Sequence, residues 1–143
     1  MPSADLAELR DAIVEIGRRL WQRGFVASND GNISVRVGPD RLLMTPASVS
    51  KGFMTPDMMV VTDLDGKTVE GTLRPSSDLD THTLLYREFP QIGGIVHTHS
   101  EFATSWAQAG RPIPGLGTTH ADYFHGPVPI TEPLTAEEVA EVY

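Results

Sequence analysis

Short runs of residues typical of β-strands, joined by tight turns, do most to limit how this chain can fold. Residues 33–37 alternate strictly, which is typical of a strand with one buried face. The Gly-Pro-Asp turn at residues 38–40 leads into a second strand over residues 42–45, so the pair predicts a β-hairpin. A further pair of strands with a tight turn between them is predicted over residues 58–62 and 68–70, around Asp65-Gly66. Strands joined in this way pair antiparallel.

Helical patterns precede and follow these strands. Between Leu6 and Leu20 the apolar residues recur at steps of three and four, which predicts an amphipathic helix that Gly24 ends. A second helix is predicted over residues 79–89, with Pro90 beyond its end. Helices interleaved with hairpins indicate an α/β fold with three layers, α/β/α, around a mixed, mostly antiparallel central sheet.

The C-terminal part of the chain carries fewer signals. The apolar, β-branched run over residues 95–99 predicts a central strand, and residues 101–108 predict a short helix. Residues 111–133 are rich in Pro, Gly and Thr and are expected to be mostly irregular, with one short strand near residues 128–130. A capping box at residues 135–138, in which a Thr precedes a Glu by three positions, predicts the start of another helix.

Composition excludes several classes of function. The chain holds no cysteine, so a metal ion would need His, Asp or Glu ligands, and neither a disulfide nor a cysteine nucleophile is available. Its formal net charge of −8 opposes nucleic-acid binding, and no apolar run is long enough to cross a membrane. The first residues are acidic, unlike a secretory signal, so we expect a cytoplasmic protein. No repeat or linker divides the chain, and a single domain over residues 1–143 is expected.

His97 and His99 form the strongest single signal for chemistry. Side chains at positions i and i+2 of a strand leave it on the same side, so two imidazoles at this spacing can converge on one cation. Histidines near a strand end are also often structural or solvated. The pair alone therefore does not decide between a metal site and a structural role.

Three polar segments add to this signal, and each has a second interpretation. Residues 76–78, Ser-Ser-Asp, precede a predicted helix whose first turn favours an anion, although an Asp there is also a common N-cap. Residues 31–32, Gly-Asn, form turns first and contact ligands second. The third segment, residues 45–52, reads Thr-Pro-Ala-Ser-Val-Ser-Lys-Gly. None of the three identifies a function by itself.

Taken in order, these segments resemble the class II aldolase/adducin family. The matching segments cover essentially the whole chain: residues 30–34, 45–52, 75–78 and 93–100. Two further segments are most similar to the L-ribulose-5-phosphate 4-epimerases within that family: residues 103–110 and 117–124. Family members that cleave fuculose phosphate usually carry Glu where this chain has Asp78. The epimerases usually carry Ser-Gly where this chain has Ala47-Ser48.

The resemblance implies a site for a sugar phosphate and a divalent metal ion, Zn²⁺ or Mn²⁺. It implies that His97 and His99 are metal ligands, with Asp78 on or beside the ion as a further ligand and catalytic residue. It implies that Asp122 is an acid/base residue that reaches the site of a neighbouring subunit in a homotetramer. The residues implied to hold the phosphate are Gly31, Asn32, Ala47, Ser48, Ser76 and Ser77. The histidines that we assign to structure or solvent are His82, His120 and His125.

We therefore expect an L-ribulose-5-phosphate 4-epimerase of arabinose catabolism. Such an enzyme breaks a carbon–carbon bond of the sugar in a metal-dependent retro-aldol step and re-forms it on the other face of the aldehyde. One alternative is a sugar-phosphate aldolase of the same family, such as L-fuculose-phosphate aldolase. Another is a metal-free interaction domain, as in the adducins. The resemblance also implies a third His ligand and a catalytic Tyr in a C-terminal segment that this chain lacks, so we expect a C-terminally incomplete chain.

Overall fold

The structure, a computed structural model, describes residues 5–138. The chain divides into two compact units, Met1–Ser100 and Glu101–Tyr143. The expectation of a single domain over the whole chain stays a prediction. Within the described residues, none of the helices is both long enough and apolar enough to cross a membrane.

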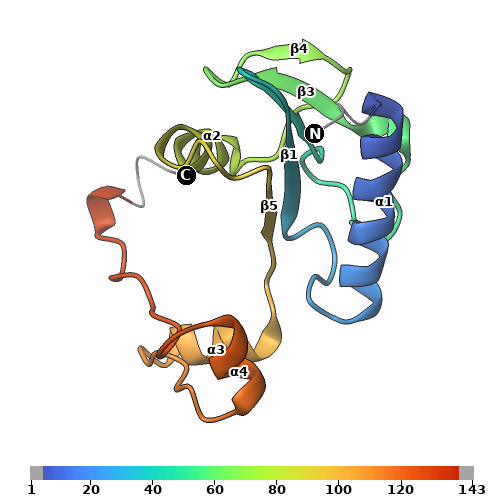
Figure 1. Ribbon diagram of the computed structural model, residues 1–143. Helices are drawn as coiled ribbons and strands as arrows, with labels where there is room; N and C mark the ends of the chain where they lie inside the picture. Colours follow the sequence, from blue (N-terminus) through green and yellow to red (C-terminus); the bar gives the residue numbers. More distant parts are fainter. Residues whose placement is uncertain (1–4, 139–143) are drawn as a thin grey trace. The chain divides into compact units, whose positions relative to one another are not determined.

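A five-stranded antiparallel sheet forms the centre of the first unit (Figure 1). Its strands are β1 (Asn32–Gly38), β2 (Arg41–Met44), β3 (Val60–Asp63), β4 (Thr68–Glu70) and β5 (Gly94–His97). Their order is β4-β3-β2-β1-β5, which confirms both predicted hairpins. The sequence predicts a mixed, mostly antiparallel sheet, and every strand pair among the described residues is antiparallel.

Strand β5 lies at the edge of the sheet, whereas the sequence predicts a central strand. Among the described strands it pairs with β1 alone, where Val96 lies opposite Ile33. Val96 is 50% exposed, so the strand is not buried on both faces. The prediction was wrong because β-branched residues suit edge and central strands alike, and their presence does not report how many neighbours a strand has.

Helix α1 (Leu6–Gln22) covers one face of the sheet, as predicted. The Asp5 carboxylate caps its first turn by accepting a hydrogen bond of 3.3 Å from the N–H of Ala7. Ile13 is fully buried against the sheet, and burying such a side chain contributes about 1.5 to 3 kcal/mol. The core on this face comprises Ile13, Ile33, Leu43, Met54, Met59 and Val61; the 3₁₀ turn η1 (Pro56–Met58) borders it.

Helix α2 (Leu79–Glu88) covers the opposite face. Ser34 leaves β1 on the side away from the α1 core, and its hydroxyl lies 2.7 Å from His82 Nδ1 and 3.0 Å from the Tyr86 hydroxyl. All three side chains are buried. Arg36, two residues along the same face, donates a hydrogen bond of 2.6 Å to the Tyr86 carbonyl. The sheet therefore lies between two helical layers, which confirms the predicted α/β/α arrangement for this unit (Figure 1).

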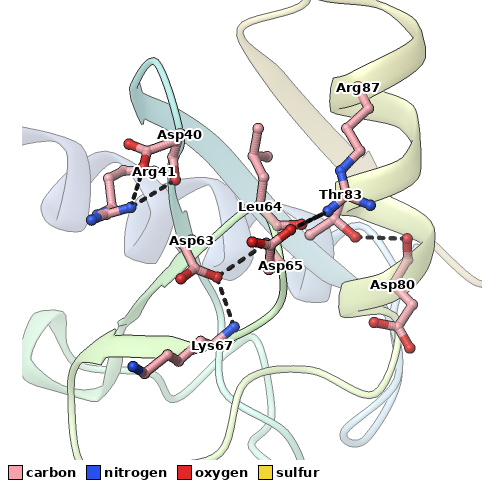
Figure 2. A network of polar contacts seen from close by, with 9 residues as sticks. All are labelled: Asp40, Arg41, Asp63, Leu64, Asp65, Lys67, Asp80, Thr83 and Arg87. Carbon is pink, nitrogen blue, oxygen red and sulfur yellow. Dashed lines mark hydrogen bonds and ion pairs between the residues drawn. The ribbon is translucent and has the colours of Figure 1, made fainter.

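A polar network fastens the C-terminal end of α2 to the β3–β4 turn (Figure 2). Asp63 Oδ1 accepts hydrogen bonds from the backbone N–H groups of Asp65 and Lys67, at 3.0 and 2.9 Å, and so shapes the turn. Arg87 donates to the Leu64 carbonyl at 2.6 Å and to the Asp65 carboxylate at 2.8 Å. These contacts fix the C-terminal end of α2 against the turn.

The second unit contains two short helices, α3 (Glu101–Gln108) and α4 (Thr118–Tyr123). Helix α3 confirms the prediction, whereas α4 lies in a segment expected to be irregular. The short strand predicted near residues 128–130 is a single bridge between Ile113 and Val128. The capping box is confirmed, because Thr135 N–H donates to Glu138 at 2.7 Å and Glu138 N–H donates to the Thr135 hydroxyl at 3.2 Å.

Candidate functional site

Three polar segments meet at one end of the sheet in the first unit. Strand β1 begins at Asn32, directly opposite His97 at the end of β5. Thr45 follows the end of β2, and its N–H donates to the carbonyl of Ile33 at 3.0 Å. The N–H of Ser76 in turn donates to the Thr45 carbonyl at 3.2 Å. The segments that the sequence singles out therefore lie side by side at the carboxyl end of β5.

Asp78, Asn32 and His97 form a tight cluster at this end. Asp78 Oδ2 lies 2.7 Å from His97 Nδ1 and accepts a hydrogen bond of 2.6 Å from the Asn32 amide. The same amide nitrogen lies 3.2 Å from His97 Nδ1. Asn32 is 3% exposed, and its Oδ1 atom is buried with no hydrogen-bond partner among the described residues. A buried oxygen without a donor costs free energy of folding.

The position of Asp78 decides between its two interpretations. Asp78 is the N-cap residue of α2, but its side chain makes no capping hydrogen bond. The Ser76 hydroxyl accepts instead from the N–H of Asp78, at 3.4 Å. The Asp78 carboxylate is turned toward the sheet, to Asn32 and His97. Helix capping therefore does not account for this aspartate.

The partners of Asp78 favour its charged form. Burial by itself would raise the pKa of the Asp78 carboxyl, but the hydrogen bonds from Asn32 and His97 outweigh burial and lower that pKa below its ordinary value. A carboxylate 2.7 Å from a ring nitrogen needs a proton between the two atoms, so His97 Nδ1 carries the hydrogen. In the neutral ring, Nε2 then keeps its lone pair. Metal-binding histidines commonly have a carboxylate behind the ring in this way.

His99 lies beyond the end of β5, so the two histidines do not share a strand face as their spacing predicts. They are nevertheless neighbours, with ring centroids 4.9 Å apart and planes inclined at 45°. The backbone N–H of His99 donates to the Phe25 carbonyl at 3.0 Å, which fixes it beside the loop before β1. Its Nδ1 lies 3.9 Å from an Asp30 carboxylate oxygen. Loop contacts, rather than strand geometry, bring the histidine pair together.

These residues fit a divalent metal ion in part. Two neighbouring imidazoles, one of them with a free Nε2, are suitable ligands for Zn²⁺ or Mn²⁺. Asp78 Oδ2 is bonded to His97, however, and within residues 5–138 no group of three or more His, Asp or Glu side chains is arranged to hold a metal ion. The predicted ligand set of Asp78, His97 and His99 therefore stays a prediction. The structure supports only the proximity of the two imidazole rings.

Two of the residues predicted to hold the phosphate have a left-handed backbone. Gly31 has a φ of 68°, and a Cβ atom there would lie 2.5 Å from Val26 Cγ1 and 2.8 Å from the carbonyl oxygen of His97, so only glycine fits. Ser48 has a φ of 59°, which is uncommon for a residue with a side chain. The family resemblance implies glycine at this second position, which agrees with the positive φ of Ser48.

The other predicted phosphate residues differ in exposure. Asn32 and Ser76 are buried, whereas Ser77 is exposed. The N–H of Ala47 donates to the Arg74 carbonyl at 2.9 Å, so its backbone donor is already engaged. The structure brings all of these segments to the end of the sheet that carries the histidines. Binding of a phosphate by them stays a prediction.

Asp122 belongs to the second unit, where it lies in α4 and is exposed. Its acid/base role stays a prediction. Two of the histidines assigned to structure or solvent, His120 and His82, have structural surroundings. His120 Nε2 lies 2.8 Å from the Gly126 carbonyl, and His82 is 1% exposed beneath the sheet. His125 is exposed.

Sequence reasoning missed the roles of two charged residues in this region. Asp30 accepts a hydrogen bond of 2.8 Å from the N–H of Ala27 and so shapes the loop before β1. Lys51 is 2% exposed and donates to two backbone carbonyls. Both residues stand in segments that carry the family resemblance, which is the signal that marks them. Their burial and contacts are not visible in polar loop sequences, because lysine and aspartate are mostly exposed.

Comparison with known proteins identifies the family. Residues 11–142 match the family described as Class II Aldolase and Adducin N-terminal domain. The chain belongs to this family. The match confirms the resemblance that the ordered motifs indicate, and it covers both units of the chain.

Curated relatives within the class II aldolase/adducin family include L-ribulose-5-phosphate 4-epimerases. The L-ribulose-5-phosphate 4-epimerase UlaF of Salmonella paratyphi B is 46% identical over 140 residues, which are 96% of this chain and 61% of the relative. The UlaF epimerase of Salmonella typhi is similar to the same extent. The chain therefore spans about three fifths of the length of these curated relatives.

Solved structures show the same fold. The L-fuculose-1-phosphate aldolase of Thermus thermophilus is 26% identical with a TM-score of 0.78, over 96% of this chain and 69% of that one. YgbL of Klebsiella pneumoniae is 30% identical with a TM-score of 0.70, over 73% of this chain and 50% of that one. The class II aldolase fold predicted from the sequence is thereby confirmed.

Proposed function

We propose that this chain carries the metal-binding and phosphate-binding part of an L-ribulose-5-phosphate 4-epimerase. The observation that carries the proposal is the orientation of Asp78, which leaves the helix uncapped and contacts His97 at 2.7 Å. A carboxylate placed behind an imidazole is a common feature of histidine metal sites. The similarity to the UlaF epimerases, at 46% identity, supports the choice of L-ribulose 5-phosphate among the substrates of the family.

The proposed metal ligands are His97 and His99, with Asp78 holding the His97 ring or joining the ion. A bound Zn²⁺ or Mn²⁺ supplies Lewis acidity for the negative charge that develops on the sugar oxygens when the carbon–carbon bond breaks. The role of the protein's own residues is to orient the Nε2 lone pair of His97 toward the ion. The hydrogen bond from His97 Nδ1 to Asp78 fixes the ring orientation and the tautomer before any ion arrives.

The phosphate end of the substrate is proposed to bind where the loops around Gly31, Ser48 and Ser76 meet. Backbone N–H groups of left-handed turns form small anion sites, and these do not need a positive net charge. Holding the phosphate serves the reaction because it retains the aldehyde fragment after cleavage, so that the fragment turns and recombines. The Asn32 side chain, whose amide holds the Asp78 carboxylate, is proposed to keep that carboxylate in place beside the substrate.

Asp122 is the proposed acid/base residue for the oxygen at the inverted carbon. Its carboxylate is exposed on α4, as a group that serves the site of a neighbouring subunit would be. This role requires an oligomer, and we propose the homotetramer that the family resemblance implies. Mixing Asp122→Asn with His97→Ala protein restores turnover in mixed oligomers if the two residues act across subunits.

The proposal is tested by metal content and epimerase turnover on L-ribulose 5-phosphate. Wild-type protein is expected to bind about one Zn²⁺ or Mn²⁺ per chain. His97→Ala is expected to lose the metal, whereas Asp122→Asn keeps the metal and loses turnover. His120→Ala is a matched control, since His120 contacts the Gly126 carbonyl in the other unit. Folded wild-type protein that binds no divalent metal would instead favour the metal-free interaction domain.

A second candidate is a sugar-phosphate aldolase of the same family. The likeness to the L-fuculose-1-phosphate aldolase of Thermus thermophilus, with a TM-score of 0.78, favours this alternative. The two functions are separated by assaying L-ribulose 5-phosphate beside L-fuculose 1-phosphate. Net cleavage of either substrate into fragments indicates the aldolase, whereas interconversion of two intact pentose phosphates indicates the epimerase.

A further inference from the structure

Lys51 is a buried charged residue to which the proposed function gives no task. It is 2% exposed, and its backbone lies against helix α1, because a Cβ atom on Gly17 would come within 2.7 Å of the Lys51 carbonyl oxygen. A buried ammonium group costs free energy unless it is well bonded. A methionine would fill a similar space without that cost. The charge is therefore better explained by what it binds than by packing.

The Lys51 ammonium group joins two loops. It donates to the carbonyl of Val49 at 2.7 Å and to the carbonyl of Asn29 at 3.2 Å. Asn29 lies in the loop of residues 27–31, which ends at Gly31. Val49 lies in the loop of residues 46–50, directly after the left-handed Ser48. One side chain thus links the two loops that are proposed to bind the phosphate.

The electrostatics of this place fit an anion nearby. Burial lowers the pKa of Lys51, and the Asp30 carboxylate in the first loop acts in the opposite direction. The chain as a whole has a formal charge of −8, so an anionic ligand is repelled at long range. The Lys51 ammonium group, which donates to carbonyls of both loops, is a local source of positive potential.

We propose that Lys51 is a positioning residue that ties loop 27–31 to loop 46–50 and so makes one anion-binding unit of them. The inference rests on the proposed function for the identity of the anion, the phosphate of the sugar. Lys51 acts through backbone groups: by holding the carbonyls of Asn29 and Val49, it fixes the two loops that carry Gly31 and Ser48. It has no direct contact with the reacting atoms.

The test compares Lys51→Met, Lys51→Gln and Val61→Ala with the wild type. Lys51→Met removes the charge, Lys51→Gln keeps a shorter donor, and Val61→Ala weakens the core outside both loops. Amide hydrogen exchange of each loop and the affinity for inorganic phosphate and for L-ribulose 5-phosphate are measured, with Zn²⁺ binding as a reference. In Lys51→Met both loops exchange at least about tenfold faster and phosphate binds about tenfold more weakly, with Zn²⁺ binding unchanged.

The remaining variants give the result its meaning. For Lys51→Gln, the loop exchange rates and the phosphate affinity are expected to lie between those of Lys51→Met and the wild type. Val61→Ala, compared with Lys51→Met at a similar loss of stability, is expected to leave the exchange of the two loops unchanged relative to the rest of the first unit. The inference is overturned if the loops exchange alike in Lys51→Met and the wild type, or if Lys51→Met binds phosphate as tightly as the wild type does. A wild type that binds neither phosphate nor L-ribulose 5-phosphate refutes the proposed function instead, and the exchange measurement then still reports on the link between the loops.

Discussion

The buried His82 makes the stability of the first unit depend on pH. His82 is 1% exposed, and its Nδ1 lies 2.7 Å from the Ser34 hydroxyl beneath the sheet. Burial lowers the pKa of His82 from 6.5 to about 4, with the charge of Asp78 opposing this shift and the charge of His97 adding to it. Folding therefore favours the neutral form of the His82 ring.

The sign of the effect follows from which state binds the proton. Between the two pKa values the unfolded chain takes up a proton on His82 that the folded chain does not, so acidification stabilises the unfolded state. The contribution of His82 to the free energy of unfolding is therefore fully present above the pKa of the unfolded chain. It is lost as the pH drops through that value toward the pKa of the folded protein. For these two pKa values the loss is about 2 kcal/mol between about pH 7 and about pH 5, and about 3 kcal/mol once the folded pKa is reached.

Urea unfolding at a series of pH values measures this loss. Trp21, whose ring packs edge-on against Phe53 at 5.1 Å, reports on the first unit when Trp106 in the other unit is replaced by Phe. His82→Gln in the same background is the matched control, because it keeps a polar side chain that does not titrate. The wild type is expected to lose about 2 kcal/mol over this range and the variant much less. Equal losses in the two proteins would refute the assignment to His82.

Three substitutions at the site give further expectations. Gly31→Ala, with its φ of 68° and a Cβ contact of 2.5 Å, is expected to cost at least about 2 kcal/mol in urea unfolding; a smaller loss means that the loop relaxes. Ser48→Gly relieves a φ of 59° and is expected to raise the free energy of unfolding by up to about 1 kcal/mol, whereas a lower value shows that the serine is not strained. Asp78→Asn removes the carboxylate behind His97 and is expected to weaken Zn²⁺ binding about 10-fold to 100-fold in a competition titration. Unchanged affinity would remove Asp78 from the metal site.

Local sequence signals were sufficient for much of the fold. The hairpin of β1 and β2 follows from the alternation over residues 33–37, the Gly-Pro-Asp turn and the apolar run after it, since the chain between the two strands is too short for any other pairing. The α1 helix follows in the same way from its apolar periodicity. The edge position of β5 does not, because strand order depends on which neighbours are present rather than on the residues of the strand.

The candidate site shows the same division between local and long-range information. The sequence supplied the residue types, and the family resemblance supplied their expected partners. The contact between Asp78 and His97 joins residues that are separated by a helix and a turn, so no local pattern distinguishes it from helix capping. His99 reaches its neighbour through a hydrogen bond to the Phe25 carbonyl, which strand periodicity does not describe. The burial of Lys51 in a polar loop likewise becomes visible only in three dimensions.

The proposed function depends above all on the paired rings at the end of β5, which we expect to bind a divalent metal ion. NMR of the ring nitrogens of all five histidines, recorded while Zn²⁺ is added to the 143-residue chain, follows this binding atom by atom. His97 is expected to start with hydrogen on Nδ1, and its Nε2 signal to shift together with a ring nitrogen of His99, before any change at His82, His120 or His125. If the signals of His97 and His99 stay in place, or move no earlier than those of the exposed His125, the rings are not the metal site.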